Sequence, residues 1–457
     1  MPSTPVRWLE TRWGFATIAV LCTALAVALR IGWVLQVQSP ADAVYSDMAG
    51  YLGRALEWVS GAADTDRRWA LYPPGTHVAF GIALWLLGRE SLETLGIVLA
   101  VANAGVVPFA MAIARRTLST PGAAAAVGLV VACWPAQLVF AGYFSSESPY
   151  MLALTASVWL WVRFVQTGRG PLVTGIVSCI AFSIRPPILL SCGLSLGWIV
   201  LRRRELPWLR WRPMLLLGLP FVAALGFSGQ RFYSLTGEWG LISENAHIVQ
   251  FFAGTDFLRI ETRDAEGNTT AWFSPPPMEA LGYTKIFRFE GWPADAATLE
   301  RERERNLEGR GFAHRLLLLQ RNIRLLALGN ESWPEFQRAG TGPRKLLLQG
   351  GSWLAVHAAI PLALLGMGAL CFRKNPGLEV VALHIATSVA TAAVYLGEIR
   401  YRVPYDGLLI VLAVYAVTAL LRRGCVDTPQ EGWIRNAGLA LAAAWLVLMV
   451  LPWGALV

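Results

Sequence analysis

The sequence predicts an all-α protein that crosses a membrane many times, because long apolar runs recur along a chain that carries few charges. Of its 457 residues, 55% are hydrophobic and only 15% are charged, whereas about a quarter of the residues in soluble domains are charged. Apolar runs of about 20 residues recur from Gly14 to Val457, and an α-helix needs that length to cross ~30 Å of hydrocarbon. This pattern excludes a soluble enzyme, and the lack of ten-residue alternating segments excludes an outer-membrane barrel.

We expect about eleven spanning helices, with the N-terminus in the cytoplasm. They cover residues of about 14–37, 94–114, 122–140, 149–166, 171–185, 187–201, 213–233, 346–371, 378–396, 404–421 and 436–454. This division places the basic clusters on the cytoplasmic side: Arg7 and Arg12, Arg115 and Arg116, Arg163 and Arg169, Arg202 to Arg204 with Arg210 and Arg212, Arg373 and Lys374, and Arg422 and Arg423. It also requires that the short apolar run 76–88 does not cross, so we expect a helix there at the outer interface.

The net charge of +9 does not indicate nucleic-acid binding, because the arginines gather in short loops between apolar runs. Nearly all of the six cysteines lie within or at the ends of apolar helices without CxxC spacing, so we interpret them as small apolar residues. The first apolar run is too long for a cleaved signal peptide and lacks a small-residue cleavage site. We therefore expect the basic residues to interact with the lipid bilayer, and we expect no nucleic-acid partner.

Two polar segments are expected outside the membrane on the extracytoplasmic side. Residues 39–93 form the first outer loop, within an N-terminal transmembrane module that covers residues 1–235. Residues 236–345 are about a hundred residues, enough for a small extracytoplasmic domain, and residues 346–457 form the C-terminal transmembrane helices. The alternating Glu and Arg residues of 300–310 predict a solvated helix with intrahelical ion pairs, with a phosphate clamp as the alternative.

The first candidate site lies in the outer loop, where apolar residues at helical spacing predict an amphipathic helix over residues 46–59. Its other face carries Asp47, Tyr51 and Arg54, so a carboxylate lies one turn from a phenol and two turns from a guanidinium. Asp47 is a candidate catalytic base at the membrane surface. The alternative is that Asp47 only caps the helix.

Two further outer segments carry polar candidates. The turn that contains Tyr72 holds two prolines and precedes His77, which is a candidate base or ligand, or else bonds a neighbouring loop. Glu147 lies in a tight outer turn, where a carboxylate is either solvated or converges with Asp47. Two such carboxylates can bind a divalent cation, Mg²⁺ or Mn²⁺, or divide the roles of base and orienting group.

A late cluster combines charges and tyrosines at the outer end of an apolar helix. Glu398, Arg400, Tyr401 and Arg402 lie together there. Arginine presents forked donors that suit a phosphate, so the cluster indicates binding of a phosphate-bearing lipid. An interfacial anchor, which uses the same residue types, is the alternative.

Taken together and in order, these segments resemble the GT-C class of polytopic glycosyltransferases, in the branch of protein O-mannosyltransferases and the aminoarabinose transferase of lipid A. The similar motifs are Ser46-Asp47 with Tyr51 and Ala55, the Tyr72-Pro73-Pro74-Gly75 turn with the short helix to Leu87-Gly88, Ser146-Glu147, Ser183-Ile184-Arg185-Pro186, Ser243-Glu244-Asn245 with Phe251 to Gly254, and Glu398 to Pro404. Many relatives carry an acidic pair in the first loop, whereas here Met48 follows Asp47.

The resemblance implies a GT-C-like fold and transfer of a sugar from a polyprenyl-phosphate donor, outside the cytoplasm and with inversion. The implied catalytic residues are Asp47 as base and Glu147 as a second carboxylate, with a metal at these two residues as an option. The implied phosphate contacts are Arg185, Arg400 and Arg402. Substrate-lining candidates are Tyr51, Arg54, Tyr72, His77, Asn245, His247, Glu398 and Tyr401.

The expected enzyme is a hexosyl or pentosyl transferase of the bacterial inner membrane, with a lipid, glycan or protein as acceptor. A transporter or flippase of lipid or glycan is one alternative, but it predicts inverted repeats with broken helix pairs in both halves, which the sequence lacks. A non-catalytic subunit of envelope assembly is the other alternative. Such a subunit tolerates the loss of Asp47, whereas the enzyme does not.

Overall fold

The computed structural model describes residues 11–61, 66–87, 91–118, 120–206, 208, 211–275, 278–279, 281–328, 343–370, 375–421 and 429–450. Several residues used in the sequence interpretation lie outside these ranges, namely Arg7, Gly88, Arg210, Arg373, Lys374, Arg422 and Arg423, with the ends of the expected helices 346–371 and 436–454.

Helices occupy each of the expected apolar segments within these ranges. In chain order they are α2 (Arg12–Gln36), α5 (Leu92–Ala104), α6 (Val106–Thr117), α7 (Pro121–Ala132), α8 (Pro135–Ala141), α9 (Glu147–Thr167), α10 (Pro171–Ile184), α11 (Ile188–Leu201), α12 (Trp211–Thr236), α17 (Pro343–Leu354), a π-helical turn (Ala355–Ala359), α18 (Ile360–Leu370), α19 (Pro376–Val394), α20 (Ile399–Arg402), α21 (Asp406–Leu421) and α22 (Pro429–Val450). Short 3₁₀ helices cover Pro40–Ala43, Arg67–Ala70 (η2), Arg203–Glu205 and Val403–Tyr405 (η5).

Within the described part of the chain, six helical segments are long and apolar enough to cross a membrane. A seventh is added if α7 and α8, which meet at a bend of 46°, form one broken span. The chain is therefore an integral membrane protein, while the number of about eleven crossings stays a prediction.

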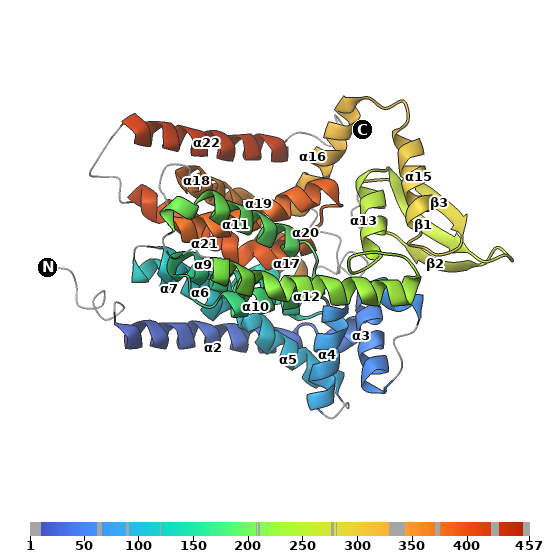
Figure 1. The fold of residues 1–457 in the computed structure, drawn as a ribbon, viewed down its shortest axis with the longest axis horizontal. Helices are drawn as coiled ribbons and strands as arrows, with labels where there is room; N and C mark the ends of the chain where they lie inside the picture. The colour runs from blue at the N-terminus through green and yellow to red at the C-terminus, as the bar shows by residue number, and fades with distance from the viewer. Residues whose placement is uncertain are drawn as a thin grey trace.

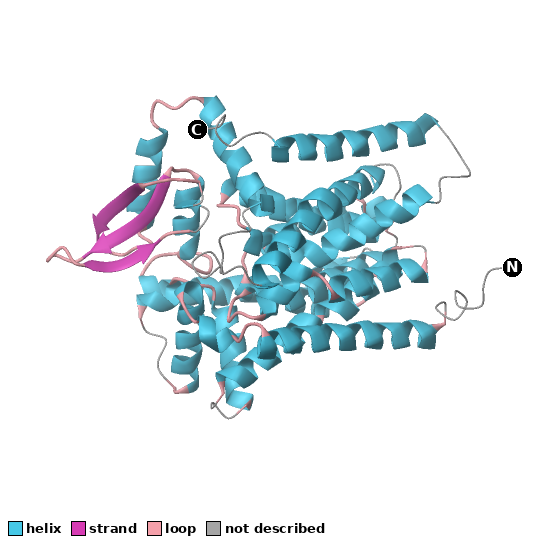
Figure 2. Ribbon diagram, turned by 180° about the vertical axis from the view of Figure 1, so that it is seen from behind, coloured by secondary structure: helices cyan, strands magenta, loops and turns pink. Residues whose placement is uncertain are grey.

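The long helices α2, α12 and α22 share one direction, and the polar segments gather at one end of this bundle (Figure 1). The end with the polar segments carries α3 (Ser46–Val59), α4 (Pro74–Leu86) and a β-sheet, and α2 begins at the opposite end (Figures 1 and 2). α3 and α4 lie across the bundle direction, which agrees with the interfacial position predicted for the run 76–88.

The helices α3 and α4 of the first loop pack closely against each other. A Cβ atom at Gly81 of α4 would lie 2.4 Å from the Trp58 ring of α3, so only glycine permits this approach. Ile82, Trp85 and Leu86 on α4 remain 46% to 69% exposed. An exposed apolar face of this kind suits a helix that lies in the membrane interface.

The buried guanidinium group of Arg30 links three helices of the bundle. Arg30 of α2 is fully buried, and its Nε donates to Oδ1 of Asn103 (2.7 Å), while Nη1 donates to the carbonyl oxygen of Ala132 (2.9 Å). Ala132 ends α7, where carbonyl groups lack helical partners and can therefore accept from a cation. Asn103 donates in turn to Oγ of Ser148 (3.1 Å), next to Glu147. The network thus positions the start of α9.

The expectation of an all-α chain is wrong for the segment between α12 and α17. There, α13 (Asn245–Ala253), α15 (Ala296–Leu307) and α16 (Phe312–Leu328) accompany a three-stranded sheet of order β2-β1-β3. β1 (Phe257–Arg263) pairs antiparallel with β2 (Thr269–Phe273) and parallel with β3 (Lys285–Glu290). The alternation of Phe287 and Phe289 with Arg288 and Glu290 is the period-two signal that identifies β3.

The predicted intrahelical ion pairs of the Glu/Arg-rich helix are confirmed. In α15, Arg303 lies 3.1 Å from Glu300, and Arg305 lies 2.9 Å from Glu302, each pair being three residues apart. Pairs at this spacing lie on one face of a helix and stabilise it by about 0.2–0.5 kcal/mol each.

Candidate active site

Asp47 lies near the start of α3, and its carboxylate is held by two groups from distant segments. The hydroxyl of Tyr72 donates to Oδ1 (2.6 Å), and Nη1 of Arg400 donates to Oδ2 (2.7 Å). Tyr72 lies in the turn between η2 and α4, whereas Arg400 lies in α20, 353 residues after Asp47. Only the folded chain brings these three segments together.

The alternative role of Asp47 as a helix cap is wrong. The N-cap residue of α3 is Tyr45, and its side chain makes no capping bond. Among the described non-glycine residues, Ser46 alone has a positive φ, of 50°, a conformation that costs an L-residue about 1–2 kcal/mol. Backbone strain of this kind occurs preferentially at functional sites, and here it directly precedes Asp47.

Arg400 is fixed by three neighbours at once. Besides Asp47, its Nε lies 2.7 Å from Oε2 of Glu398, and its Nη2 donates to the hydroxyl of Tyr401 (3.1 Å). The side chain of Glu398 is only 1% exposed. Glu398 therefore holds the guanidinium group of Arg400 through Nε, while Nη1 of the same group reaches Asp47 on α3.

The Glu147 carboxylate is buried and paired, so its solvated alternative is wrong. Glu147 forms an ion pair with Nη2 of Arg185, and its side chain is 1% exposed. Nε of Arg185 also donates to Oγ of Ser146 (3.1 Å), and its Cζ lies 5.2 Å from the centre of the Tyr401 ring. Pro186, next to Arg185, follows the end of α10. The Arg185 turn is thereby joined to both α9 and α20.

Asp47, Arg185 and Arg400 line a cavity of about 390 Å³, whereas the predicted catalytic residue Glu147 is not part of its wall and reaches it only through Arg185. Six of the predicted site residues contribute to its wall: Asp47, Tyr51, Arg185, Asn245, Arg400 and Tyr401. Much of the remaining wall is apolar, with Phe182, Ile184, Leu189, Leu190, Leu241 and Leu396. Leu190 and Leu241 are 48% and 62% exposed, so the apolar wall reaches the outer surface of the bundle. The cavity therefore suits an amphiphile with an anionic group and a hydrocarbon chain.

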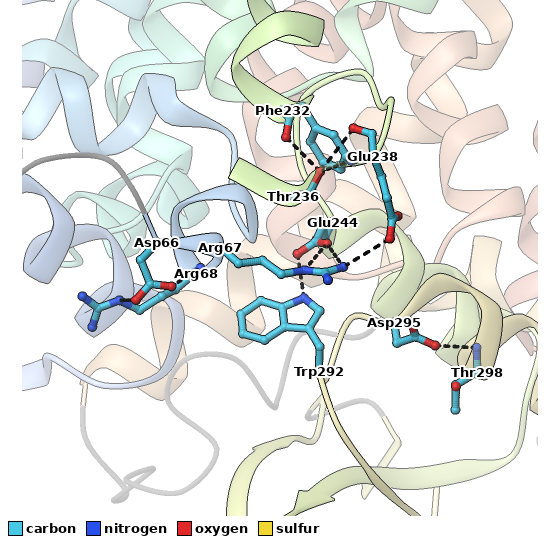
Figure 3. A network of polar contacts seen from close by, with 10 residues as sticks. All are labelled: Asp66, Arg67, Arg68, Phe232, Thr236, Glu238, Glu244, Trp292, Asp295 and Thr298. Carbon is cyan, nitrogen blue, oxygen red and sulfur yellow. Dashed lines mark hydrogen bonds and ion pairs between the residues drawn. The ribbon is translucent and has the colours of Figure 1, made fainter. Parts of the chain in front are cut away.

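A polar network ties the first loop to the start of α13, beside this cavity (Figure 3). Nη2 of Arg67 donates to Oε1 of Glu244 (2.6 Å), and the indole Nε1 of Trp292 donates to Oε2 (2.6 Å). The next residue, Asn245, donates its backbone N–H to the carbonyl oxygen of Leu71 (3.0 Å). Glu244 thus anchors the segment that precedes Tyr72 to the segment that brings Asn245 to the cavity.

Arg402 does not reach the cavity, unlike Arg400 two residues before it. Nε of Arg402 donates to Oδ1 of Asp406 (3.1 Å), and Nη1 donates to the carbonyl oxygen of Ala327 (2.9 Å). Nε1 of Trp134 donates to the other oxygen of Asp406 (2.7 Å). With its side chain 3% exposed, Arg402 joins α20, α21 and α16, so we correct its expected contact with phosphate to a structural contact.

Tyr72 and Glu398 lie one contact away from the cavity wall. Neither residue lines it, but each bonds one that does, Asp47 or Arg400. We therefore correct their expected contact with substrate to a positioning contact.

Three other candidates lie outside the cavity wall. The guanidinium of Arg54 donates to the carbonyl oxygen of Gly50 (2.8 Å) and covers the Tyr72 ring, with its Cζ 5.1 Å from the ring centre. His77 is buried against the edge of Trp69, and burial lowers the pKa of His77 to about 3. His247 is half-buried in the first turn of α13. These three residues therefore do not contact a ligand in this cavity.

Two tyrosines of the cavity are absent from the predicted set. Tyr150 and Tyr405 line the wall, and their hydroxyl oxygens lie 2.9 Å apart. Tyr150 follows Glu147 by three residues on α9, and this helical spacing is the signal that identifies it. Tyr405 ends the late cluster of charges and tyrosines and follows Tyr401 by four residues, so a helical spacing marks it as well.

The electrostatic environment keeps Asp47 ionised. Burial raises the pKa of Asp47, whereas the charge of Arg400 and the hydrogen bond from Tyr72 lower it. The lowering effects together exceed the effect of burial, so the pKa of Asp47 lies below its usual value. Burial raises the pKa of Glu398, which Arg400 only partly opposes. Burial and the charge of Asp47 both raise the pKa of Tyr51. Asp47 is therefore the ionised carboxylate of the cavity wall, which is the protonation state that a general base requires.

Replacing Tyr72 by Phe is expected to move the acid limb of the kcat/KM profile to higher pH. The Tyr72 hydroxyl lowers the pKa of Asp47, so its removal raises this pKa and Asp47 becomes protonated at a higher pH as the pH falls. The fraction of enzyme with an ionised base then declines earlier. The measurement is kcat/KM against pH, with Tyr233→Phe at a partly exposed position of α12 as control. An unshifted acid limb in Tyr72→Phe would contradict this role.

The residues around Asp47 and Glu147 fit a divalent cation poorly. Both oxygens of Asp47 are already bonded, and Glu147 is paired with Arg185. A cation there would displace a guanidinium or lie beside its positive charge. Across the part of the chain that the structure describes, no group of three His, Cys, Asp or Glu side chains is placed to hold a metal ion.

No family model and no curated protein matches the chain. It is similar to the apo oligosaccharyltransferase of Archaeoglobus fulgidus, over 98% of this chain and 56% of that one, with 13% identity and a TM-score of 0.46. The same enzyme tethered to an acceptor peptide gives 11% identity and a TM-score of 0.49, over 98% and 55% of the two chains. ArnT from Cupriavidus metallidurans bound to undecaprenyl phosphate gives 14% identity and a TM-score of 0.47, over 94% and 63%.

The chain therefore spans less than two thirds of the length of each of these proteins. The similar structures are GT-C glycosyltransferases. This is the class that the sequence motifs resemble.

Proposed function

We propose that this chain is a membrane glycosyltransferase that moves a sugar from a polyprenyl-phosphate donor to an acceptor hydroxyl, with inversion at the anomeric carbon. The observation that carries this proposal is the cavity in which Asp47, Arg185 and Arg400 line the same wall as a series of apolar side chains. The arginines suit the phosphate, the apolar wall suits the polyprenyl chain, and the carboxylate suits a proton transfer.

The transfer needs a group that accepts the proton of the acceptor hydroxyl. It also needs positive charge near the departing phosphate, where negative charge develops. The acceptor oxygen attacks the anomeric carbon, the bond from that carbon to the phosphate oxygen breaks, and the hydroxyl proton passes to Asp47. Each oxygen of Asp47 retains a second lone pair beyond its present hydrogen bond, so the carboxylate can accept this proton. Arg185 and Arg400 stabilise the charge that develops on the departing polyprenyl phosphate. No step uses a metal ion.

Glu147 acts through Arg185 in this scheme. A guanidinium that is oriented before the donor binds loses less freedom on binding, and fixed charges stabilise a transition state without reorganisation. Glu147 and Ser146 orient Arg185, as Glu398 orients Arg400. Each donor-binding arginine thus has its own buried carboxylate.

We place the reaction at the extracytoplasmic face of a bacterial inner membrane. The support is that α3 and α13, which contribute to the cavity wall, lie at one end of the bundle (Figure 1). The basic clusters of the sequence assign the other end to the cytoplasm. The transferred sugar is a hexose or a pentose, and identifying the lipid-linked donor that the protein consumes will establish which.

Comparing lipid-linked sugars in cells with and without this protein tests the function as a whole. We expect one polyprenyl-phosphate sugar to accumulate without the protein, and mass spectrometry of the lipid extract then identifies the donor. Restoration by the wild-type chain but not by Asp47→Asn links the change to the site. An unchanged set of polyprenyl-phosphate sugars would contradict the proposal.

Replacing Arg400 by Lys is expected to raise the KM for the donor about tenfold or more, because lysine keeps the charge but lacks the forked donors. A hydrogen bond to a charged group contributes about 1.5–3 kcal/mol, and 1.4 kcal/mol is a factor of about ten. Arg402→Lys is the matched control. It should lower the thermal stability, through its contacts with Asp406 and Ala327, and leave the donor KM unchanged. Equal effects of both substitutions on KM would refute the assignment.

A further inference from the structure

The two donor-binding guanidinium groups lie beside the same aromatic ring. Cζ of Arg185 lies 5.2 Å from the centre of the Tyr401 ring, and Cζ of Arg400 lies 5.1 Å from the same centre. The two positive charges are close enough to interact, and like charges repel each other. Glu147 and Glu398 orient the two side chains, but the segments that carry these side chains must be held in place by backbone packing.

The turn that carries Arg185 packs against a glycine of the first outer loop. A Cβ atom at Gly75 would lie 2.5 Å from the carbonyl carbon of Ser183 and 2.6 Å from the backbone N of Ile184, the residue before Arg185. Gly75 lies in the first turn of α4, three residues after the tyrosine whose hydroxyl bonds Asp47. This contact therefore fixes the Arg185 turn relative to the segment that holds Asp47.

The segment that carries Arg400 packs through a second glycine against α16. A Cβ atom at Gly397 would overlap the carbonyl oxygen of Asn322 on α16 and would lie 2.9 Å from the backbone N of Leu326. Gly397 directly precedes Glu398, whose carboxylate holds Arg400. The helix α16 of the extracytoplasmic segment thus supports the part of the chain that brings Arg400 to the cavity.

Space, and not backbone conformation, requires glycine at both positions. Neither Gly75 nor Gly397 has a positive φ, so another residue could adopt the same backbone angles. Both glycines are buried, and the atoms that a Cβ would meet belong to the backbone of the neighbouring segment. Backbone cannot rotate away as a side chain does, so an added methyl group must shift one segment against the other.

We propose that Gly75 and Gly397 are positioning residues that hold Arg185 and Arg400 at the separation that the donor phosphate requires. The inference rests on the proposed function, because it concerns the two arginines assigned to that phosphate. Hydrogen bonds from a guanidinium to a phosphate oxygen depend on distance and angle. Two guanidinium groups that are already held together bind the phosphate without a further cost of bringing like charges close.

Binding of undecaprenyl phosphate to the full-length protein in detergent tests each glycine. Gly75→Ala and Gly397→Ala should each weaken binding about tenfold, which corresponds to the loss of one charge-assisted hydrogen bond. Gly366→Ala is the matched control, since a Cβ there would lie 2.6 Å from the carbonyl oxygen of Leu412, away from the cavity wall. The control should lower thermal stability and bind undecaprenyl phosphate normally. Equal weakening in all three variants would reflect a general loosening of the fold and would overturn the proposal.

A double-mutant cycle shows whether each glycine acts through its own arginine. Gly75→Ala should have no further effect on binding once Arg185 is replaced by Gln, but should keep its full effect beside Arg400→Gln. Gly397→Ala should show the reverse. In the transfer assay, both glycine variants should raise the donor KM and leave the acceptor KM unchanged. A purely structural role would give effects that add in every combination, and this result would refute the assignment.

The arginine variants by themselves separate this inference from the proposed function. If Arg185→Gln and Arg400→Gln bind undecaprenyl phosphate as the wild type does, the assignment of the donor site fails. If both arginine variants bind weakly while Gly75→Ala and Gly397→Ala bind normally, the donor site stands and the positioning role of the glycines is wrong.

Asn322→Ala is a milder second variant for the contact at Gly397. It removes the hydrogen bond from Nδ2 to the carbonyl oxygen of Ala393 (3.4 Å), which joins α16 to the end of α19, and it adds no atom. We expect a smaller loss of binding than in Gly397→Ala, and no loss beside Arg400→Gln. If Gly397→Ala fails to fold and Asn322→Ala binds normally, Gly397 supports only the fold and the proposal fails there. Failure of Gly75→Ala to fold, with Gly366→Ala folded, would count against Gly75 in the same way.

Discussion

Replacing Asp47 by Asn is expected to lower the rate of sugar transfer by about 10²- to 10⁴-fold, the usual effect of removing a general base. The substitution keeps the size of the side chain and an oxygen for the Tyr72 hydroxyl, but removes the group that accepts the proton. Arg400 keeps Glu398 as a charged partner at 2.7 Å, so the structural cost should be small. The measurement is turnover of a defined polyprenyl-phosphate sugar by the purified variant.

The matched control is Asp264→Asn, which changes a partly exposed aspartate in the turn between β1 and β2. This variant should transfer sugar at the wild-type rate. Thermal unfolding of all three proteins in detergent checks that the loss in Asp47→Asn does not come from misfolding. Near-normal turnover by Asp47→Asn would instead favour the non-catalytic assembly subunit, which tolerates this change.

Replacing Glu147 by Gln is expected to lower the free energy of unfolding by about 3–5 kcal/mol, because it leaves the charge of Arg185 buried without its partner. The Glu147 side chain is 1% exposed and that of Arg185 is 13% exposed, so water compensates little of this charge. Transfer should also fall, since Arg185 loses the group that orients it. Thermal unfolding in detergent and the transfer assay report the two effects separately.

The double variant Glu147→Gln/Arg185→Gln separates stability from function. With both charges removed, no unpaired ion remains, and most of the lost stability should return. The transfer rate should stay low, because the phosphate then lacks one of its two guanidinium contacts. Recovery of transfer together with stability would show that the pair only supports the fold, and Arg400 alone would remain as the donor contact.

The sequence by itself determined the membrane class and the helical segments, because both follow from local properties. The length of an apolar run and the spacing of its polar residues depend only on neighbours in the chain. For the same reason Asp47 and Tyr51, four residues apart, were predicted on one face of a helix, and both line the cavity. The resemblance to GT-C glycosyltransferases likewise rests on short motifs and needed no tertiary information.

Only the tertiary structure distinguished the roles of Arg400 and Arg402. The two residues are equal in type and lie in one short helix, where residues two apart point to different sides. Packing of α20 against α3, α16 and α21 directs Arg400 to Asp47 and buries Arg402 against Asp406. In the same way, the burial of Glu147 depends on Arg185, 38 residues later.

The parallel pairing within the three-stranded sheet was not predictable because it depends on contacts between distant residues. β1 pairs in parallel with β3, and its register joins Ile260 to Phe287 across an intervening strand and loop. A parallel pair cannot be closed by a tight turn, so no local turn signal marks it. Sequence patterns report what a segment prefers, whereas charges and strands that are far apart acquire their partners only when the chain folds.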